Sequence, residues 1–498
     1  MAGEQDEMAK ASTMTLEHSS PFHVNSDSTL EEASVVDEKK VLRKMDLRLI
    51  PIVTALYLLC FLDRGNIGNA KIEGLLDDIN LTSQQYNMCL TAFFFTYAAF
   101  ELPSNMVLKR LRPSIWLSAI MVGVGIVMTL MGIVENYHGL LVSRIFLGVT
   151  EAGLFPGVAF YITTWYCRHE AQFRQALFFS AASVAGAFSG LLAFAIAAKL
   201  QKMDGVAGLD GWRWIFILEG LLTVIVAASA FFIIVDYPHE AKFLSEDEKA
   251  WVIHRLKNQF GSNVEGPSSI QWKYVWEAVS DYQIWIGVVA FWGILVPLYG
   301  ISFFLPSIIR DLGYSSSNAQ LLTVPIYGTA ALIAVGSAWL SDRAKKRSPF
   351  LIFHCSCIII GFAIVLASTG KGVPGVVYFG IFLAVSGIYP GVPSIVNWIS
   401  NNLAGDYKRA VGMGLHIGLG NIGGAFASNF YRAQDAPIYY LGHGLELGFA
   451  VAGLIAVITL RVVYQRVNKA REANGTGNLT AEEMVRMGDK SPAFRYML

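Results

Sequence analysis

Long apolar segments alternate with short polar ones along most of the chain. A helix needs about 20 apolar residues to cross ~30 Å of hydrocarbon, and twelve segments of this sequence reach that length. They are expected at 48–70, 87–108, 114–134, 139–164, 176–200, 212–235, 283–306, 319–341, 350–368, 374–398, 409–431 and 442–465. The pattern predicts an all-α membrane protein with twelve transmembrane helices.

A polar stretch after the sixth segment divides the chain into two halves of six helices each. The expected order is a disordered tail at 1–46, a bundle at 47–235, a linker at 236–280, a second bundle at 281–465 and a tail at 466–498. The first tail is polar and acidic, without the apolar core of a secretory signal. In the linker, the Ser245–Glu248 spacing is typical of a capping box that begins a short amphipathic helix.

The two halves resemble each other in sequence. Leu-Phe-Pro-Gly at 154–157, followed by Trp165, matches Ile-Tyr-Pro-Gly at 388–391, followed by Trp398. The basic turn before Pro113 likewise matches the basic turn before Pro349. Parallel half-repeats with a binding site between them are characteristic of alternating-access carriers.

The distribution of charge predicts the orientation in the membrane. The 498 residues are 54% hydrophobic and 15% charged, with zero formal net charge, which gives no basis for nucleic-acid binding. Lys and Arg gather before the first segment and in alternate turns, so both termini are expected in the cytoplasm. The sequon at Asn80 then falls in an outer loop and is a candidate glycosylation site, whereas those at Asn474 and Asn478 should stay unmodified.

Two charged pairs stand out inside apolar segments of the first half: Asp63 with Arg64, and Arg144 with Glu151. Such groups cost about 2.5–3.5 kcal/mol each on insertion scales and usually mark a transport path. At ~1.5 Å per residue, Arg64 and Arg144 reach similar depth from two helices, and Glu151 lies two turns below Arg144 on nearly the same face. Two guanidiniums suit a carboxylate substrate, and Asp63 or Glu151 suits proton coupling.

Polar groups from other helices complete the candidate site. Tyr97 and Asn421 reach the depth of Glu151. The second half has no charged residue deep in a segment, so it is expected to recognise the rest of the substrate, and its polar candidates are Tyr299, Tyr389, Asn397, His416 and Asn421.

Structural explanations compete with these roles. Asp63–Arg64 and Arg144–Glu151 could be ion pairs that fix helix packing, although neighbours on a helix point ~100° apart, so only one of Asp63 and Arg64 need face a cavity. His416 could be a packing residue. Glu101 and Glu219, near segment ends or between helices, are interpreted as structural.

Several motifs indicate no chemistry. The five cysteines have no metal-ligand spacing and are interpreted as packing residues. The Gly-rich run at 418–423 lacks the strand and βαβ unit of a dinucleotide site and fits close helix packing. We therefore expect no metal, no cofactor and no enzyme activity.

The chain resembles the major facilitator superfamily from about residue 45 to 465. The run at 338–347 is similar to that superfamily's inner-loop motif, which implies an inner gate of Asp342, Arg343 and Arg347. Met106 stands at the position matching Asp342 in the first half and departs from the pattern. The runs at 62–70, 144–156, 212–220 and 420–424 resemble the anion:cation symporters, in particular fungal allantoate and nicotinate permeases.

This resemblance implies a monomeric, multi-pass carrier of the fungal plasma membrane. Matching positions in bacterial galactonate and vesicular anion carriers imply proton coupling at Asp63 and Glu151 and anion binding at Arg64 and Arg144. We therefore expect proton symport of a small organic anion by alternating access. Two alternatives are a proton antiporter that exports a carboxylated metabolite and a nutrient receptor that binds without transporting.

Overall fold

The computed structural model describes residues 36–498 apart from 109–110, 168–169, 171–173, 176, 180, 183, 192–204, 206–207, 261–271, 405, 476–478, 481–482 and 485–486. Ten helices within this part are long and apolar enough to cross a membrane. The second predicted segment is also a long helix, α5 (Ser83–Leu108), packed among them. The fifth, 176–200, lies partly outside the described residues. The prediction of an all-α membrane protein is confirmed.

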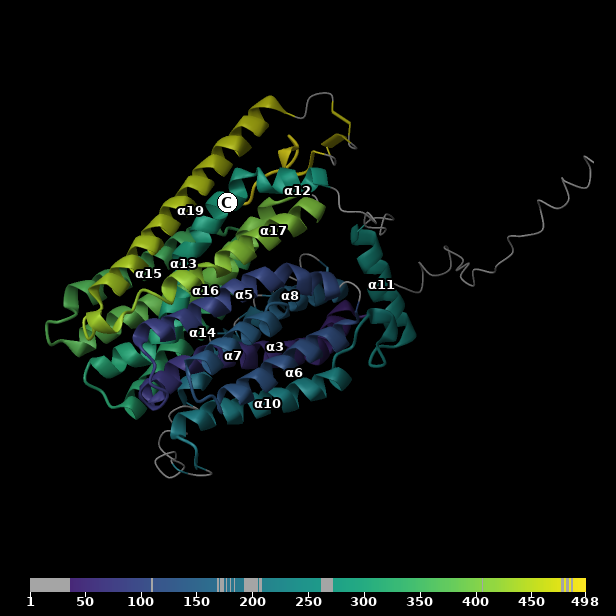
Figure 1. Cartoon of the computed structure of the whole chain (residues 1–498). Helices are drawn as coiled ribbons and strands as arrows, with labels where there is room; N and C mark the ends of the chain where they lie inside the picture. Colours follow the sequence, from purple (N-terminus) through teal and green to yellow (C-terminus); the bar gives the residue numbers. More distant parts are fainter. Residues whose placement is uncertain are drawn as a thin grey trace, which may run out of the picture.

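The first bundle packs α10 against α6 and α3, and α7 against α5. Figure 1 shows these helices side by side in the lower half of the view. Its described long helices, besides α5, are α3 (Glu38–Ile72), α6 (Pro113–Met131), α7 (Tyr137–Glu151), α8 (Leu154–Trp165) and α10 (Gly211–Ile233).

The second bundle packs α15 against α16, and α13 against α19 (Figure 1). Its helices are α13 (Tyr282–Asp311), α14 (Ser316–Ala344), α15 (Ser348–Ser368), α16 (Pro374–Asn402), α17 (Asp406–Asn421), α18 (Gly423–Ala427) and α19 (Tyr440–Asn474). Between the bundles, α13 contacts α3, and α5 contacts α17 and α18. These helices therefore form the interface at which a site shared by both halves must lie.

The connection between the bundles carries the short helices η3 (Pro238–Glu240), α11 (Glu246–Phe260) and α12 (Trp272–Val279). The predicted capping box is present: Glu248 N–H donates to Ser245 Oγ at 3.3 Å, and Ser245 N–H donates to Glu248 Oε2 at 3.0 Å. Lys44 of α3 also donates to Glu248, at 2.6 Å. Burial acts to raise the pKa of Glu248, but the bond from Lys44 and the cap outweigh it and lower the pKa.

We call the end of the bundles that carries the start of α3 and the connecting helices the linker end, and the opposite end the far end. Contacts close the far end between the bundles. Gln320 Nε2 of α14 donates to Glu73 Oε1 at 3.0 Å, and Asn429 Nδ2 donates to Thr91 Oγ1 at 2.9 Å. The far-end connections also include the short helix α4 (Leu75–Asp78) and η4 (Ala433–Asp435).

Two predicted spans are each broken into two helices. The span at 139–164 is interrupted between Glu151 and Leu154, and the span at 409–431 is interrupted at Ile422. At the first break Gly153 allows close approach of α5, since a Cβ there would lie 1.8 Å from Ser104 Oγ. Broken helices at mid-membrane depth are common beside transporter binding sites.

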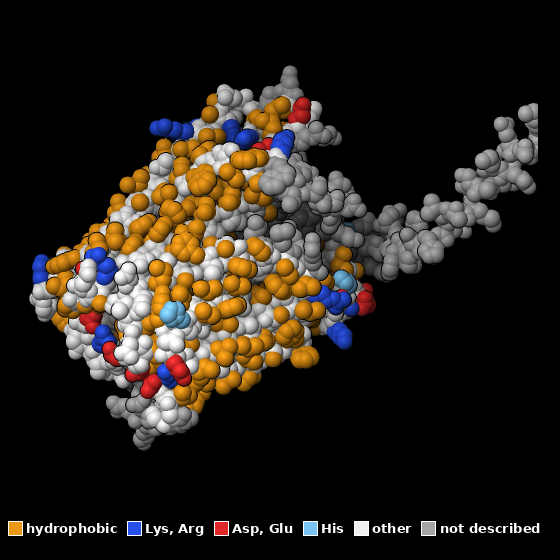
Figure 2. Space-filling model, in the orientation of Figure 1, with side chains coloured by type: hydrophobic (Ala, Val, Ile, Leu, Met, Phe, Trp, Pro, Cys, Tyr) orange, Lys and Arg blue, Asp and Glu red, His pale blue; other side chains and the backbone are white. Residues whose placement is uncertain are grey.

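The outer surface is apolar between two charged ends. Figure 2 shows hydrophobic side chains covering the middle of the visible face, with Lys, Arg, Asp and Glu gathered toward its ends. Large apolar side chains that are mostly exposed include Phe232, Ile225 and Leu332. In water this surface would be unfavourable, whereas lipid tails solvate it.

Candidate functional site

Arg64 is the centre of a hydrogen-bonded chain that crosses from one bundle to the other. From the middle of α3, its Nε donates to Glu151 Oε1 at 2.8 Å, and its Nη2 donates to the same oxygen. Its Nη1 donates to the Tyr299 hydroxyl of α13 at 2.8 Å, and this hydroxyl donates to Asn421 Oδ1 of α17 at 2.8 Å. Four helices from both bundles thus share one polar chain.

The ends of this chain coincide with the two helix breaks. Glu151 is the last residue of α7, and Asn421 is the last residue of α17. Glu151 Oε1 also accepts from Cys60 Sγ at 3.0 Å, whereas Glu151 Oε2 has no hydrogen-bond partner in the described part of the chain. One carboxylate oxygen therefore remains available to a proton or to a donor.

Aromatic rings surround the Arg64 guanidinium. Its Cζ lies 5.2 Å from the Phe93 ring centroid, 5.1 Å from that of Tyr97, 5.6 Å from that of Tyr299 and 5.9 Å from that of Phe61. Cation–π contacts of this kind partly compensate a guanidinium that has lost its water. Tyr97, one of the candidates from the sequence, therefore lies beside Arg64.

Arg144 lies beside this cluster, with no hydrogen-bonding partner among the residues that the structure describes. Its Cζ is 5.9 Å from the centroid of the same Phe93 ring, so the two guanidiniums approach one aromatic side chain. Arg144 is only 1% exposed, and its Nε and Nη2 make no hydrogen bond to any described residue. A buried cation with unsatisfied donors is unfavourable unless an anion or water completes it.

Asp63 faces away from Arg64, into the first bundle. Its Oδ2 accepts from Thr223 Oγ1 of α10 at 3.0 Å, and its Oδ1 has no partner among described residues. Glu219, one turn earlier on α10, is buried and interacts electrostatically with Asp63. Neither of the two ion pairs considered from the sequence, Asp63–Arg64 and Arg144–Glu151, forms. Arg64 pairs with Glu151 instead, and Asp63 bonds Thr223 of α10.

The remaining second-half candidates separate into two groups. Tyr389 of α16 reaches the interface, where its ring centroid lies 6.5 Å from that of Phe61. His416 is fully buried and stacks on Phe291 of α13 at 4.8 Å, with no contact to Arg64. Asn397 is half-buried farther along α16. The structure thus places Tyr299, Tyr389 and Asn421 at the interface and His416 within the second bundle.

The predicted gate residues lie at the linker end of α14. Arg347 donates to Asp342 and, at 2.8 Å, to Ser341 Oγ. The Arg343 Cζ lies 5.5 Å from the Trp339 ring centroid. At the far end, Asn80 is exposed in the turn before α5, with a positive φ of 49°.

Sequence reasoning missed two kinds of residue. Cys60, interpreted as packing, donates to Glu151. Glu446 of α19 is fully buried against Gly300, with both carboxylate oxygens lacking a partner in the described structure, and His443 one turn earlier lies 3.2 Å from the Tyr431 hydroxyl through Nδ1. The sequence analysis does not single out Glu446, which lies four residues into the predicted span at 442–465.

Comparisons with known proteins agree with this architecture. The family model described as Major Facilitator Superfamily matches residues 53–428. The chain is 35% identical over 479 residues to the MFS-type transporter cnsO of Penicillium expansum, covering 93% of this chain and 92% of that protein. It is 34% identical over 493 residues to the high-affinity nicotinic acid transporter of Saccharomyces cerevisiae, covering 98% and 90%.

Solved structures show the same fold at low sequence identity. A bacterial homologue of the human lysosomal transporter Spinster, in an inward-facing and unoccupied conformation, matches with a TM-score of 0.62 at 15% identity. The match covers 85% of this chain and 96% of that chain. The expectations of a transporter fold and of a protein that is not an enzyme are confirmed.

Proposed function

Because the chain belongs to the Major Facilitator Superfamily and is a membrane transporter of that type, we propose that it carries a small organic carboxylate together with protons, by alternating access. The similarity to a nicotinic acid transporter supports a small organic substrate. The observation that carries the proposal is the pair of buried guanidiniums against one ring, with Arg64 bound to Glu151, and with Nε and Nη2 of Arg144 lacking an acceptor in the described part of the chain.

Arg144 and Arg64 take the substrate carboxylate. The unsatisfied Nε and Nη2 of Arg144 supply two donors, and a guanidinium fork matches a carboxylate with two parallel hydrogen bonds. Two donors of Arg64, Nε and Nη2, already bind Glu151 Oε1. A substrate carboxylate that approaches Arg64 therefore competes with Glu151 for the same nitrogen atoms.

This competition couples substrate to protons. When the substrate displaces Glu151 from Arg64, two carboxylates face the guanidiniums in a site with little water. A proton taken from solvent onto Glu151 neutralises the displaced carboxylate, so substrate and proton enter together. On the other side, loss of that proton lets Glu151 pair with Arg64 again and releases the substrate. Asp63, with Glu219 nearby, supplies a second buried carboxyl for proton transfer within the first bundle.

The second bundle closes the site from the other side. Tyr299 and Asn421 continue the hydrogen-bonded chain from Arg64, so a solute bound at Arg64 changes contacts in both bundles. Tyr389 and Tyr97 provide aromatic walls for the rest of the solute. The closed far end described above corresponds to one of the two end states that rigid-body rocking of the bundles requires.

The orientation completes the proposal. We place the linker end in the cytoplasm, with both termini there, in a monomer of the plasma membrane. Asp342, Arg343 and Arg347 then stand at the inner gate, and Asn80 at the outer surface accepts a glycan. A mobility shift on glycosidase treatment that Asn80→Gln removes is expected. A glycan attached at Asn474 instead would place the linker end outside.

Transport in vesicles tests the function. Purified protein in liposomes should accumulate labelled nicotinate, or a mono- or dicarboxylate that competes with it, when the substrate side is acidic. Collapse of the pH gradient with a protonophore should abolish accumulation and preserve exchange. Accumulation driven by the opposite gradient would establish antiport, and saturable binding without flux would establish a receptor. Either result would overturn the proposal of symport.

A further inference from the structure

Residues 488–498, which we call the docked segment, lie against the linker end of the second bundle. Two side-chain amides, those of Asn402 and Asn468, each accept from and donate to its backbone. Asn402 accepts from Met497 N–H at 2.7 Å and donates to its carbonyl at 3.1 Å. Asn468 of α19 accepts from Tyr496 N–H at 2.9 Å and donates to the Tyr496 carbonyl at 2.8 Å. The prediction of a simple polar tail from 466 onward misses this packing.

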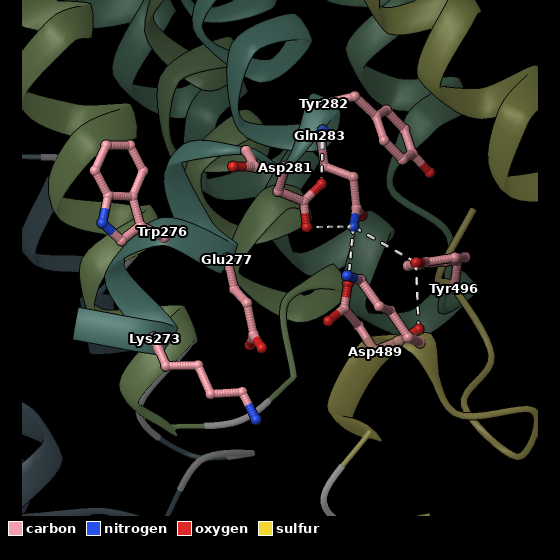
Figure 3. A pocket seen from close by; sticks show the side chains of 10 residues that line it. Lys273, Trp276, Glu277, Asp281, Tyr282, Gln283, Asp489 and Tyr496 are labelled. Carbon is pink, nitrogen blue, oxygen red and sulfur yellow. Dashed lines mark hydrogen bonds between the residues drawn. The ribbon is translucent and has the colours of Figure 1, made fainter. Parts of the chain in front are cut away.

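The docked segment also completes a buried charge cluster. Lys408 Nζ, near the start of α17, lies 2.5 Å from Asp281 Oδ2 at the start of α13 and 2.8 Å from Asp489 Oδ1 of the docked segment. Gln283 Nε2 donates to Asp489 Oδ2 at 2.9 Å, as Figure 3 shows. The three charged side chains are each at most 6% exposed. Asp489 therefore ties the docked segment to the first turns of both α17 and α13.

The first bundle has a counterpart in the same place. Arg174, two residues before the fifth predicted span, donates to Asp46 of α3 at 2.6 Å, as Lys408 contacts Asp281 in the second bundle. Glu170, beside Arg174, is bound by Arg255 of the linker helix α11 at 2.7 Å. In each half, the segment that follows the last helix of the bundle thus returns to the start of that bundle's fifth span.

The tryptophans of the half-repeat show the same correspondence. Trp165, at the end of α8, stacks on Phe243 of the linker at 6.0 Å. Trp398 of α16 donates from Nε1 to the Met497 carbonyl of the docked segment at 2.8 Å. The docked segment therefore supports the second bundle as the linker supports the first.

α17 connects this cluster to the transport site. Lys408 is near its first residue, and Asn421, which accepts from Tyr299 beside Arg64, is its last. At ~1.5 Å per residue the two lie about 20 Å apart on one rigid helix. Because the span breaks after Asn421, α17 is a half-helix whose position depends on its contacts at the linker end.

Water has access to one side of the docked segment. A pocket of about 470 Å³ lies between α12, the start of α13 and the docked segment. Figure 3 shows Asp489, Tyr496 and Gln283 on its wall, with Lys273 and Glu277 of α12 across from them. Asp489 therefore borders this pocket, although the residue itself is buried.

We propose that Lys408, Asp281 and Asp489 form a latch that fixes α17, and that docking of residues 488–498 closes this latch and sets the rate of transport. With the segment docked, α13, α16, α17 and α19 are joined at the linker end and the second bundle rocks as one body. With the segment released, α17 shifts, Asn421 no longer holds the Tyr299 hydroxyl, and turnover falls. A phosphate on Ser491, which is buried in the docked state, would favour release.

A peptide in trans tests the latch. In the full chain, residues 488–498 are replaced by a Gly-Ser sequence of equal length, and a synthetic peptide of the native 488–498 sequence is added to the purified protein. We expect exchange turnover to fall by about tenfold with little change in KM, and the peptide to restore it, because the replacement removes the contacts of Asn402, Asn468 and Lys408 with the segment and the peptide supplies them again. A peptide carrying Asn in place of Asp489 is the matched control and should restore much less.

A second variant keeps the test decisive if that replacement does not fold. Asn468→Ala in the otherwise native chain removes the two hydrogen bonds between Asn468 and the Tyr496 backbone and leaves the contacts of Lys408 unchanged. A cysteine at Ser491, with Cys357 replaced by Ser, should then react with a maleimide faster than in the parent, and exchange should slow. Wild-type turnover in a chain whose Ser491→Cys is fully reactive would overturn the latch, as would failure of the native peptide to bind the replaced chain.

Discussion

Arg64 and Glu151 form an ion pair that joins the middle of α3 to the last residue of α7. Both side chains lie at the interface of the two bundles, and Arg64 alone extends the contact to Tyr299 in the other half. The pair is therefore more than a packing device of the first bundle, since any solute that binds Arg64 must disturb both Glu151 and the second bundle.

Glu151→Gln should separate exchange from accumulation. The amide can accept from Arg64 but cannot gain and lose a proton, so substrate exchange should persist within about threefold while uphill accumulation disappears. Counterflow and pH-driven uptake of labelled nicotinate in the same liposomes measure the two activities. Cys60→Ala removes the other partner of Glu151 Oε1 and is the control, in which accumulation should survive. Accumulation by Glu151→Gln at the parental level would exclude Glu151 from coupling.

Arg144→Met should abolish uptake without lowering stability. A charge-assisted hydrogen bond contributes ~1.5–3 kcal/mol, so loss of one bond to the substrate carboxylate reduces affinity by about 10- to 100-fold. Because Arg144 has no acceptor among the described residues, its removal should leave the unfolding temperature unchanged or raise it.

Arg213→Gln is the matched control for Arg144. Arg213 is also buried in the first bundle, but it donates to the Val134 carbonyl at 2.6 Å and to Asp210 at 2.9 Å. This control should lower the unfolding temperature and retain substrate affinity. A destabilised Arg144→Met that still binds substrate would identify Arg144 as structural.

Tyr299→Phe and Asn421→Ala should act as one unit. The Tyr299 hydroxyl bridges Arg64 and Asn421, so its removal breaks the chain at the same place as removal of Asn421. We expect each variant to lower uptake by about tenfold and the double variant to be little worse than either single one. A double-mutant cycle on kcat/KM measures this coupling. Fully additive losses would mean that the two residues act separately.

Acid should favour the arrangement with a closed far end. Burial raises the pKa of Glu73 above its ordinary value, and this exceeds the opposing effects of the bond from Gln320 and of Arg310. Opening the far end hydrates Glu73 and returns its pKa toward about 4.3. The state with the higher pKa binds the proton more tightly, so a fall in pH through the window above ~4.3 stabilises closure.

Accessibility of a cysteine at Ser316, which contacts Ile72 across the far end at 3.3 Å, measures this closure. Its labelling rate, divided by the thiolate fraction at each pH, should fall as the external pH falls, and Glu73→Gln should make this corrected rate independent of pH in that window. Asp77→Asn, at an exposed carboxyl of α4, should keep the parental pH dependence. A slope that persists in Glu73→Gln assigns the effect to another group.

The fold could be predicted because apolar length and the half-repeat determine it. The charged residues of the site could also be found, since ionisable groups in apolar segments are rare. Their pairing could not: adjacent Asp63 and Arg64 must face different neighbours, and only the rotation of α3 decides that Arg64 meets Glu151. The docked segment was missed because side-chain amides and Lys408 hold it together with a few apolar side chains, among them Phe494, Tyr496 and Leu498, which form no long apolar segment.

The Arg64–Tyr299 hydrogen bond also affects how readily the carrier changes state without solute. The two halves cannot separate at this depth until that bond breaks. A carrier without solute offers the Arg64 guanidinium no new acceptor to replace the Tyr299 hydroxyl. In the proposed symport, a carboxylate solute supplies new acceptors for Arg64 just as Glu151 becomes neutral. A protonated carrier without solute would then return slowly, so the proposed coupling would not let the proton gradient run down when the solute is scarce.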